Sequence, residues 1–225
     1  MPDELFPGVY LLELEDQWRL ATKSESTTPV YGECFVDSYR LWDPFRSKLS
    51  AFFLKGGLER SSRTRQVFDA SSKILYLGAA NGTTISHVSE IVRDGLVYAV
   101  EFSPRAMRDL LRLCESRKNI VPILADASKP ESYCYMVEPV DLVYQDVAQK
   151  NQSEIASLNC ARYLRSDGTL ILMMKTRSID VVASPKDVYD REIEKLKGLK
   201  VLETFDLLPY HHDHWALVAR KKPNL

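Results

Sequence analysis

The segment 73–88 constrains the fold of this chain more than any other. Residues 73–77 form a short, mostly apolar run, which is typical of a strand buried on both faces of a sheet. Gly78 and Gly82 then bracket a tight turn, and the apolar side chains after the turn recur at helical spacing. A strand, a glycine turn and a helix in this order present backbone N–H groups and a helix N-terminus to a ligand. The segment therefore predicts an open α/β sheet with a ligand site at the glycine turn.

The spacing of the two glycines indicates which ligand the turn suits. Dinucleotide-binding folds carry the pattern G-x-G-x-x-G, whereas here Ala79 and Ala80 stand where the second glycine would be. This pattern disfavours a nicotinamide or flavin cofactor. It suits a ligand without a pyrophosphate, and S-adenosylmethionine is the commonest such ligand on this topology. An ordinary turn between a strand and a helix is the alternative.

An acidic residue at the end of the next predicted strand supports a ligand site. Glu101 closes the apolar run 96–101 and follows Gly82 by 19 positions. A carboxylate at about this distance from the glycine turn reaches ribose hydroxyls in this class of fold. A solvated acid at a strand end is the alternative, but the position relative to the turn favours a contact with the ligand.

From residue 74 onward, strand and helix patterns alternate, which predicts a doubly wound, mainly parallel sheet with helices on both faces. The segment 207–213, between the last two strands, is too short for a helical crossover, so these two strands should be antiparallel. A seven-stranded, Rossmann-like sheet of this kind is the class I methyltransferase arrangement. The predicted strands are 74–78, 96–101, 120–124, 140–145, 169–174, 200–206 and 214–220, and the predicted helices are 83–93, 104–116, 152–165 and 185–197.

Residues 1–42 differ in pattern and predict a small antiparallel N-terminal module, followed by a methyltransferase domain over 43–225. Segments 9–14 and 17–22 alternate around a Glu15-Asp16 turn, which predicts a β-hairpin, and 31–36 and 38–41 are candidates for further strands. A helix is then expected to begin with Asp43 as its N-cap and Pro44 at its first position, and to end at Gly56 and Gly57. Lys48 lies on this helix, and 61–66 is expected to be a polar linker.

Composition narrows the function classes. The 225 residues are 45% hydrophobic and 27% charged and contain no apolar run of transmembrane length, and the N-terminus lacks a signal-peptide pattern. We therefore expect a cytoplasmic protein with no membrane partner.

A protein that binds nucleic acid alone is usually basic, whereas the net charge here is −1, so RNA contacts should depend on a local patch or on a partner. The four cysteines, Cys34, Cys114, Cys134 and Cys160, form no C-x-x-C pair and predict buried apolar residues rather than a metal site or disulfides.

Polar residues end the predicted strands at the edge where ligands bind in this architecture. Asp126 is placed to accept a hydrogen bond from an adenine amine, with the Ala127 N–H beside it, although a helix cap is an equal alternative for Asp126. Asp146 and Lys175 end two strands that should be neighbours. They are either a buried structural salt bridge or an acid–base pair that activates a hydroxyl for methyl transfer.

These motifs together resemble the fibrillarin-like RNA 2′-O-methyltransferases. The chain looks like an archaeal member, because the glycine–arginine-rich N-terminal tail of eukaryotic members is absent. The matching segments are Val30-Tyr-Gly-Glu33, Trp42-Asp-Pro-Phe-Arg-Ser-Lys-Leu49, Leu75-Tyr-Leu-Gly-Ala-Ala-Asn-Gly-Thr-Thr84, Val100-Glu-Phe-Ser-Pro-Arg105, Asp146-Val-Ala-Gln149, Arg177-Ser-Ile-Asp180 and Asp213-His214.

The resemblance implies a catalytic tetrad and a donor pocket. The tetrad counterparts are Lys48, Asp146, Lys175 and His214. Departures from the family pattern are Gln145, Thr176 and Trp215, and the additional His211 and His212 are interpreted as loop residues. The donor-binding counterparts, with the glycines of the turn, are Gly78, Gly82, Thr83, Thr84, Glu101, Phe102, Asp126, Ala127, Asp146, Val147, Ala148 and Gln149.

A mechanism and a set of partners follow from the resemblance. The ribose 2′-oxygen should meet the sulfonium methyl of S-adenosylmethionine in line, at about 3 Å. Lys175 then accepts the hydroxyl proton or stabilises the alkoxide, Asp146 orients Lys175, and Lys48 and His214 hold the ribose and phosphate. Family members methylate rRNA, and perhaps tRNA, within a box C/D particle that contains a coiled-coil scaffold protein, a kink-turn-binding protein and a guide RNA. The alternatives are a stand-alone small-molecule methyltransferase and an inactive assembly subunit.

Overall fold

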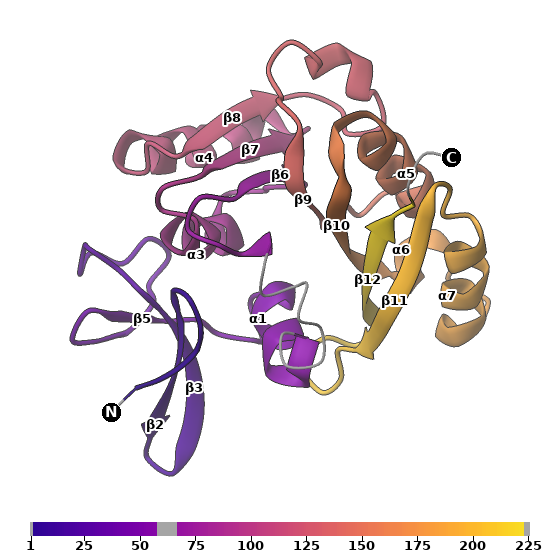
Figure 1. Ribbon diagram of the computed structural model, residues 1–225. Coiled ribbons are helices and arrows are strands. Elements are labelled where there is room, and N and C mark those ends of the chain that lie inside the picture. The colour runs from indigo at the N-terminus through magenta and orange to yellow at the C-terminus, as the bar shows by residue number, and fades with distance from the viewer. Residues whose placement is uncertain (1, 58–66, 223–225) are drawn as a thin grey trace.

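The protein combines a small N-terminal sheet with a large α/β sheet, and the computed structural model describes residues 2–57 and 67–222 (Figure 1). The predicted linker 61–66 lies outside the described residues. No helix in the described ranges is long and apolar enough to cross a bilayer.

The N-terminal sheet is antiparallel, in the order β1-β2-β3-β5-β4. The predicted hairpin is confirmed, and Glu15 and Asp16 form its turn with positive φ angles of 49° and 59°. The expected strand 31–36 is reduced to two residues, and β1 was not predicted. The strands are β1 (Asp3–Phe6), β2 (Val9–Leu14), β3 (Gln17–Lys23), β4 (Phe35–Val36) and β5 (Tyr39–Leu41).

The large sheet has seven strands in the order β11-β12-β10-β9-β6-β7-β8. β12 runs antiparallel to both β10 and β11, and the other neighbours are parallel, as the sequence predicts. The carboxyl ends of β6 to β10 therefore meet at one edge of the sheet. The strands are β6 (Lys73–Leu77), β7 (Leu96–Glu101), β8 (Ile120–Leu124), β9 (Val140–Gln145), β10 (Leu164–Lys175), β11 (Leu199–Asp206) and β12 (His214–Lys221).

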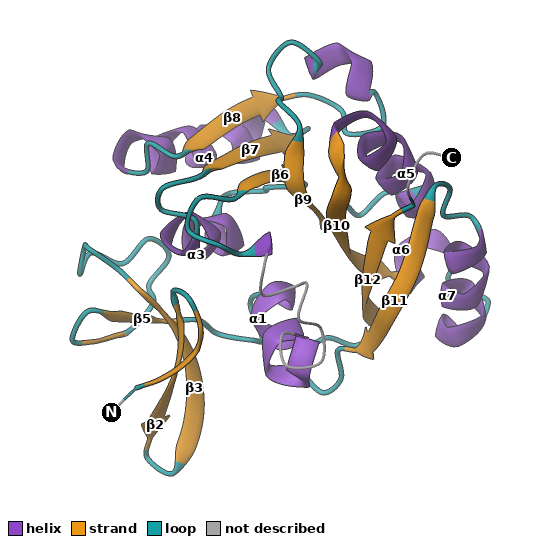
Figure 2. Ribbon diagram, in the orientation of Figure 1, coloured by secondary structure: helices purple, strands orange, loops and turns teal. Residues whose placement is uncertain are grey.

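Helices cover both faces of the large sheet (Figure 2). Apolar residues of α1, α3 and α4 join the N-terminal sheet in one core cluster, and those of α5 and α7 form a second cluster on the opposite face. The helices are α1 (Lys48–Phe52), the π-helical turn η1 (Phe53–Gly57), α3 (Thr83–Ile91), α4 (Pro104–Ser116), the 3₁₀ turn η2 (Pro130–Tyr133), α5 (Gln152–Tyr163), α6 (Thr176–Ile179) and α7 (Pro185–Glu194).

The start of α1 differs from the sequence expectation. Ser47, with the extended backbone of an N-cap, accepts a hydrogen bond from the Ser50 N–H at 3.4 Å, so the helix begins at Lys48. Asp43 instead stabilises the preceding turn, because its carboxylate accepts from the Phe45 N–H at 2.8 Å and its carbonyl from the Ser47 N–H at 3.1 Å. Lys48 thus lies at the end of α1 that is nearest the glycine turn, rather than in mid-helix.

A buried ion network joins the N-terminal sheet to helix α3. Arg40 is fully buried on β5, and its guanidinium contacts Glu33 at 3.4 Å and Glu90, on α3, at 3.2 Å. Burial lowers the pKa of Arg40, and the two carboxylates oppose that shift. Trp42 stacks on His87 of α3 at 4.7 Å. The N-terminal module is therefore packed directly onto the helix that follows the glycine turn.

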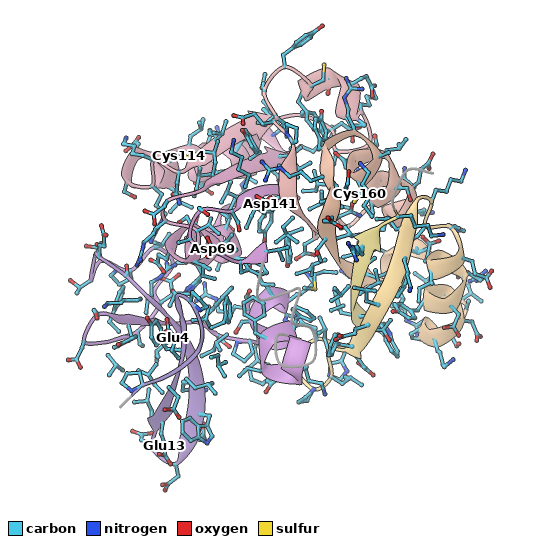
Figure 3. All side chains as sticks on the ribbon, in the orientation of Figure 1. Glu4, Glu13, Asp69, Cys114, Asp141 and Cys160 are labelled. Atoms are coloured by element: carbon cyan, nitrogen blue, oxygen red, sulfur yellow. The ribbon has the colours of Figure 1, made fainter. Side chains whose placement is uncertain are left out.

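The four cysteines are free thiols in different environments. Cys160 is buried, as expected, but Cys34 is exposed and Cys114 and Cys134 are intermediate, so the expectation that all four are buried is wrong. Cys114 on α4 and Cys160 on α5 lie far apart (Figure 3). A small polar-flanked loop can carry a cysteine without burying it, which explains Cys34 between Glu33 and β4.

Candidate active site

The glycine turn after β6 lies directly against the end of β9, and this region, with the end of β7, is called the donor side below because the sequence predicts donor binding there. Gly78 has φ +85°, and a Cβ added there would lie 2.5 Å from the carbonyl oxygen of Asp146. The Asp146 N–H in turn donates to the carbonyl of Leu77 at 2.9 Å. Only glycine permits this close approach, which places Asp146 directly beside the turn.

The second glycine begins α3 and fits closely between neighbouring elements. Gly82 has φ +100°, and a Cβ there would lie 2.7 Å from a methyl group of Leu113 on α4. Thr83 Oγ1 donates to the Asn81 side-chain oxygen at 3.2 Å, and Thr84 Oγ1 donates to Ser47 Oγ, the cap of α1, at 3.0 Å. The first turn of α3 is thereby tied to the first turn of α1.

Glu101 faces the glycine turn, as the sequence predicts. One carboxylate oxygen accepts from the Ala80 N–H at 2.8 Å, and the other accepts from the Ser103 N–H at 2.7 Å. The adjacent Phe102 leaves 67% of its surface exposed. Glu101 therefore orders the turn itself, and each oxygen retains a lone pair for a ribose hydroxyl.

Asp126 and the segment 146–149 are joined on the donor side. Asp126 accepts hydrogen bonds from the Ser128 N–H at 2.9 Å and from the Gln149 side-chain amide at 3.5 Å. These donors lower the pKa of the Asp126 carboxyl, and the Ser128 N–H is the largest cause. Asp126 stabilises a turn rather than capping a helix. Ala127 is buried beside it, Val147 is also buried, and Ala148 lies between Val147 and Gln149.

Asp146 forms its ion pair with Lys48, not with Lys175. Lys48 Nζ lies 2.8 Å from both carboxylate oxygens of Asp146, although the two residues are 98 positions apart in the sequence. Lys175 does end the strand next to β9, but the register pairs Leu172 with Gln145, so Lys175 extends roughly 7 Å beyond Asp146 along the sheet. The expected direct contact between Asp146 and Lys175 is therefore wrong, and the Lys175 ammonium makes no hydrogen bond or ion pair with a described residue.

Lys175 and His214 lie directly opposite each other on β10 and β12. The His214 Nδ1 lies 2.6 Å from the carbonyl oxygen of His212, and since a carbonyl only accepts, Nδ1 carries the proton and Nε2 the lone pair. Burial lowers the pKa of His214, and the nearby Lys48 ammonium lowers it further. The neutral ring thus presents a hydrogen-bond acceptor near Lys175.

His211 belongs to the site, although the sequence indicated only a loop residue. Its ring lies 5.7 Å from that of His214, and its Nε2–H donates to the carbonyl of Pro44 at 2.8 Å. Burial lowers its pKa, and Lys48 lowers it further. His212 between them is exposed. The sequence spacing of the three histidines does not distinguish them, because the conformation of the loop 207–213 determines which rings point inward.

Sequence reasoning also missed Gln152, a fully buried residue at the start of α5 that contacts the backbone of Lys175. A glutamine in the first turn of a helix after a strand end was the available signal. No cluster of His, Cys, Asp or Glu suited to a metal ion occurs in residues 2–57 and 67–222.

The strand order, the antiparallel last strand and the acid paired with the glycine turn define a class I methyltransferase. Residues 1–223 match the Fibrillarin family model, and the chain belongs to this family.

Relatives cover nearly the whole chain. The fibrillarin-like rRNA/tRNA 2′-O-methyltransferase of Methanothrix thermoacetophila is 52% identical over 218 residues, 97% of this chain and 98% of that protein. The fibrillarin of a fibrillarin/Nop5p complex superimposes with a TM-score of 0.87 at 43% identity, covering 97% and 100% of the two chains. Aeropyrum pernix fibrillarin with natively bound S-adenosyl-L-methionine gives a TM-score of 0.85 at 43% identity, covering 96% of each chain.

Proposed function

We propose that this protein transfers the methyl group of S-adenosylmethionine to the 2′-hydroxyl of ribose in rRNA and tRNA, guided by a box C/D RNA. The observation that carries the proposal is the placement of a Lys48–Asp146 ion pair beside the glycine turn, with Lys175 and His214 opposite each other on the neighbouring strands. One edge of the sheet thereby holds a donor pocket and a group of basic side chains.

The donor side fits S-adenosylmethionine by its chemistry. Glu101 offers carboxylate lone pairs to the ribose hydroxyls, and Asp126, whose pKa is lowered, stays ionised as an acceptor for the adenine amine. The Ala127 N–H and the segment 146–149 complete the proposed pocket with Thr83, Thr84 and Phe102. When bound, S-adenosylmethionine supplies a methyl group on a positively charged sulfonium.

On the acceptor side, we assign the 2′-hydroxyl to Lys175. Its Nζ makes no hydrogen bond or ion pair with a described residue, which leaves its donors and charge for the substrate. As an ammonium, Lys175 stabilises the negative charge on the 2′-oxygen; the alternative, in which Lys175 takes the hydroxyl proton, requires the neutral amine. Asp146 is held by Lys48 beside the donor, and His214 offers its Nε2 lone pair to a ribose hydroxyl.

The proposal includes a ribonucleoprotein particle. A structural relative was solved in complex with Nop5p, which supports a scaffold protein as a partner of this chain. We further propose a kink-turn-binding protein and a guide RNA as partners, because a net charge of −1 gives the isolated chain little general affinity for RNA. The proposed location is the cytoplasm, which cell fractionation with an antibody would test.

Reconstitution tests this function. Purified protein, S-adenosylmethionine carrying a labelled methyl group and a target RNA are combined with and without scaffold, kink-turn-binding protein and guide RNA. We expect site-specific methylation only in the complete particle, at the nucleotide that the guide selects. A small-molecule methyltransferase would consume the donor without the particle, and an inactive subunit would leave the RNA unmodified in every mixture. Site-specific methylation of naked RNA by the chain alone would contradict the dependence on partners.

A further inference from the structure

The backbone of Lys175 is held by a side chain from another element. Gln152, the first residue of α5, accepts a hydrogen bond from the Lys175 N–H at 3.0 Å through Oε1 and donates to the Lys175 carbonyl at 3.2 Å through Nε2. Gln152 is fully buried. Both contacts are to the main chain, so the ammonium of Lys175 is left out of them.

The register of the sheet explains why this contact is needed. β9 ends at Gln145, which pairs with Leu172, whereas β10 continues to Lys175. Beyond this register the β9-facing N–H and C=O groups of β10 have no neighbouring strand. The carboxamide of Gln152 offers one acceptor and one donor at this place, as a strand would, and so satisfies a part-buried backbone edge.

Gln152 is itself fixed from β9. The side-chain amide of Gln145, also fully buried, donates to the Gln152 carbonyl at 2.8 Å. On the opposite side of β10, the Thr176 N–H and hydroxyl both donate to the carbonyl of Asp213, at 3.1 Å and 3.0 Å. The Lys175 main chain is therefore fastened toward both β9 and β12.

We propose that Gln152 is a positioning residue that fixes the main chain of Lys175 and thereby the reach of its ammonium toward the ribose hydroxyl. This inference rests on the proposed function. Without the carboxamide, two main-chain groups at the end of β10 lose their partners, and the segment shifts to find others. Displacing a reacting group by about 1 Å costs on the order of 100-fold in rate, so a small shift of Lys175 has a large effect.

The test combines a rate, a donor affinity and a double mutant in the reconstituted particle. Gln152→Met keeps the size of the side chain and removes both hydrogen bonds. We expect its single-turnover methylation rate to fall by about 10- to 100-fold, with the dissociation constant of S-adenosylmethionine nearly unchanged. In a Lys175→Ala background, Gln152→Met should cause no further loss of rate, because the residue acts through Lys175.

Two further variants separate a loss of positioning from a general loss of stability. Ser157→Ala, on the same helix, removes a buried hydrogen bond to the Ser153 carbonyl at 2.7 Å and a part-buried one from the Lys197 N–H at 3.0 Å. This variant should lower the melting temperature but leave the methylation rate unchanged. Gln152→Glu keeps an oxygen for the Lys175 N–H, loses the donor, and should give a rate between those of the wild type and Gln152→Met. If Gln152→Met does not fold, Gln152→Glu carries the same comparison.

The outcomes separate this inference from the proposed function. A normal rate for the Gln152 variants, or a loss that multiplies with that of Lys175→Ala, would overturn the positioning role while the function stands. A normal rate for Lys175→Ala would overturn the catalytic assignment and this inference with it. A wild-type particle that methylates no RNA would overturn the proposed function itself.

Discussion

The donor side and the acceptor side of the site are built in different ways. The donor side consists of strand ends and turns, such as those at Gly78, Glu101 and Asp126. The carboxylates of Glu101 and Asp126 already accept hydrogen bonds from backbone N–H groups. The acceptor side brings together Lys48 of α1, Asp146 just after β9, Lys175 of β10 and His214 of β12. Its ion pair, between Lys48 and Asp146, joins residues that are 98 positions apart. The proposed donor side therefore lies within residues 78–149, whereas the acceptor side draws on positions from 48 to 214 and depends more on register and long-range packing.

The largest expected effect separates the two sides at Lys175. Lys175→Ala should lower the single-turnover methylation rate by at least about 100-fold, the range for losing a positioned proton-transfer or electrostatic group. The affinity for S-adenosylmethionine should stay the same, because Lys175 is assigned to the 2′-oxygen. Lys200→Ala, which changes an exposed lysine of β11, is the matched control. A near-normal rate in a folded Lys175→Ala variant would refute the assignment.

The converse effect is expected on the donor side. Glu101→Ala should weaken binding of S-adenosylmethionine by about 1.5–3 kcal/mol, the range for hydrogen bonds to a charged group. At saturating donor, the methylation rate should recover most of its wild-type value. Calorimetric titration measures the affinity, with Glu115→Ala, an exposed acid on α4, as control. Unchanged affinity would rule out Glu101 as a ribose ligand.

Asp146 is the residue where the two sides meet, so its replacement should affect both measurements. Asp146→Ala removes the partner of Lys48 and disturbs a segment that contacts Gly78. We expect roughly a tenfold loss in rate together with weaker donor binding. Lys48→Ala added to Asp146→Ala should cost little more, because the two side chains act as a pair. Fully additive losses in single-turnover assays would show that the ion pair has no common role.

The smallest expected effect is a difference in pH dependence. Burial, with Lys48 nearby, lowers the pKa of both His211 and His214 below 6.5, so both rings are neutral at pH 7. As the pH falls through these lowered pKa values, protonation removes the His214 Nε2 lone pair and the methylation rate declines. Stability contributed by the neutral rings is lost over the same acidic range, starting as the pH falls below about 6.5, where unfolded histidines take up protons.

Donor affinity should stay constant over that range, because the lowered pKa of Asp126 keeps its carboxylate ionised well below it. Parallel measurements of rate and of S-adenosylmethionine binding between pH 5 and pH 8 test the difference, an interval of about three units around the free histidine value. His214→Gln should flatten the acidic limb of the rate profile. A parallel decline of rate and affinity would show that acid acts on the donor side as well.

The sequence was sufficient for the fold because each of its signals is local. The apolar runs, the glycines and the short 207–213 connection predict the strands of the large sheet, the turn after β6 and the antiparallel ending, and the structure confirms these. In the N-terminal sheet, it reduces the expected strand 31–36 to two residues and adds β1. Glu101 lies beside the glycine turn for the same reason, and its contact with a ribose stays a prediction. The pattern could not predict that Ser47, rather than Asp43, begins α1, because both are good N-cap residues.

The sequence could not predict the contacts that depend on the register between neighbouring strands. The two positions by which Lys175 passes Asp146 depend on how β9 and β10 align, and neither strand signals its alignment. With this alignment, Asp146 pairs with Lys48 instead of Lys175, and the main chain of Lys175 bonds to Gln152 instead of to a neighbouring strand. His211 points inward because its Nε2–H donates to the backbone carbonyl of Pro44, a contact across 167 positions.

The place of β12 in the sheet also orders the events by which a newly made chain becomes an enzyme. β12 lies between β10 and β11, and β11 has no other neighbour in the large sheet, so this part of the sheet cannot form before residues 214–221 have left the ribosome. The strands β6 to β9, whose ends hold the proposed donor-binding residues, are synthesised earlier. The proposed donor-binding residues between Gly78 and Gln149 therefore leave the ribosome before His214 does. Insertion of one late strand then brings His214 beside Lys175 and completes the group to which the reaction is assigned.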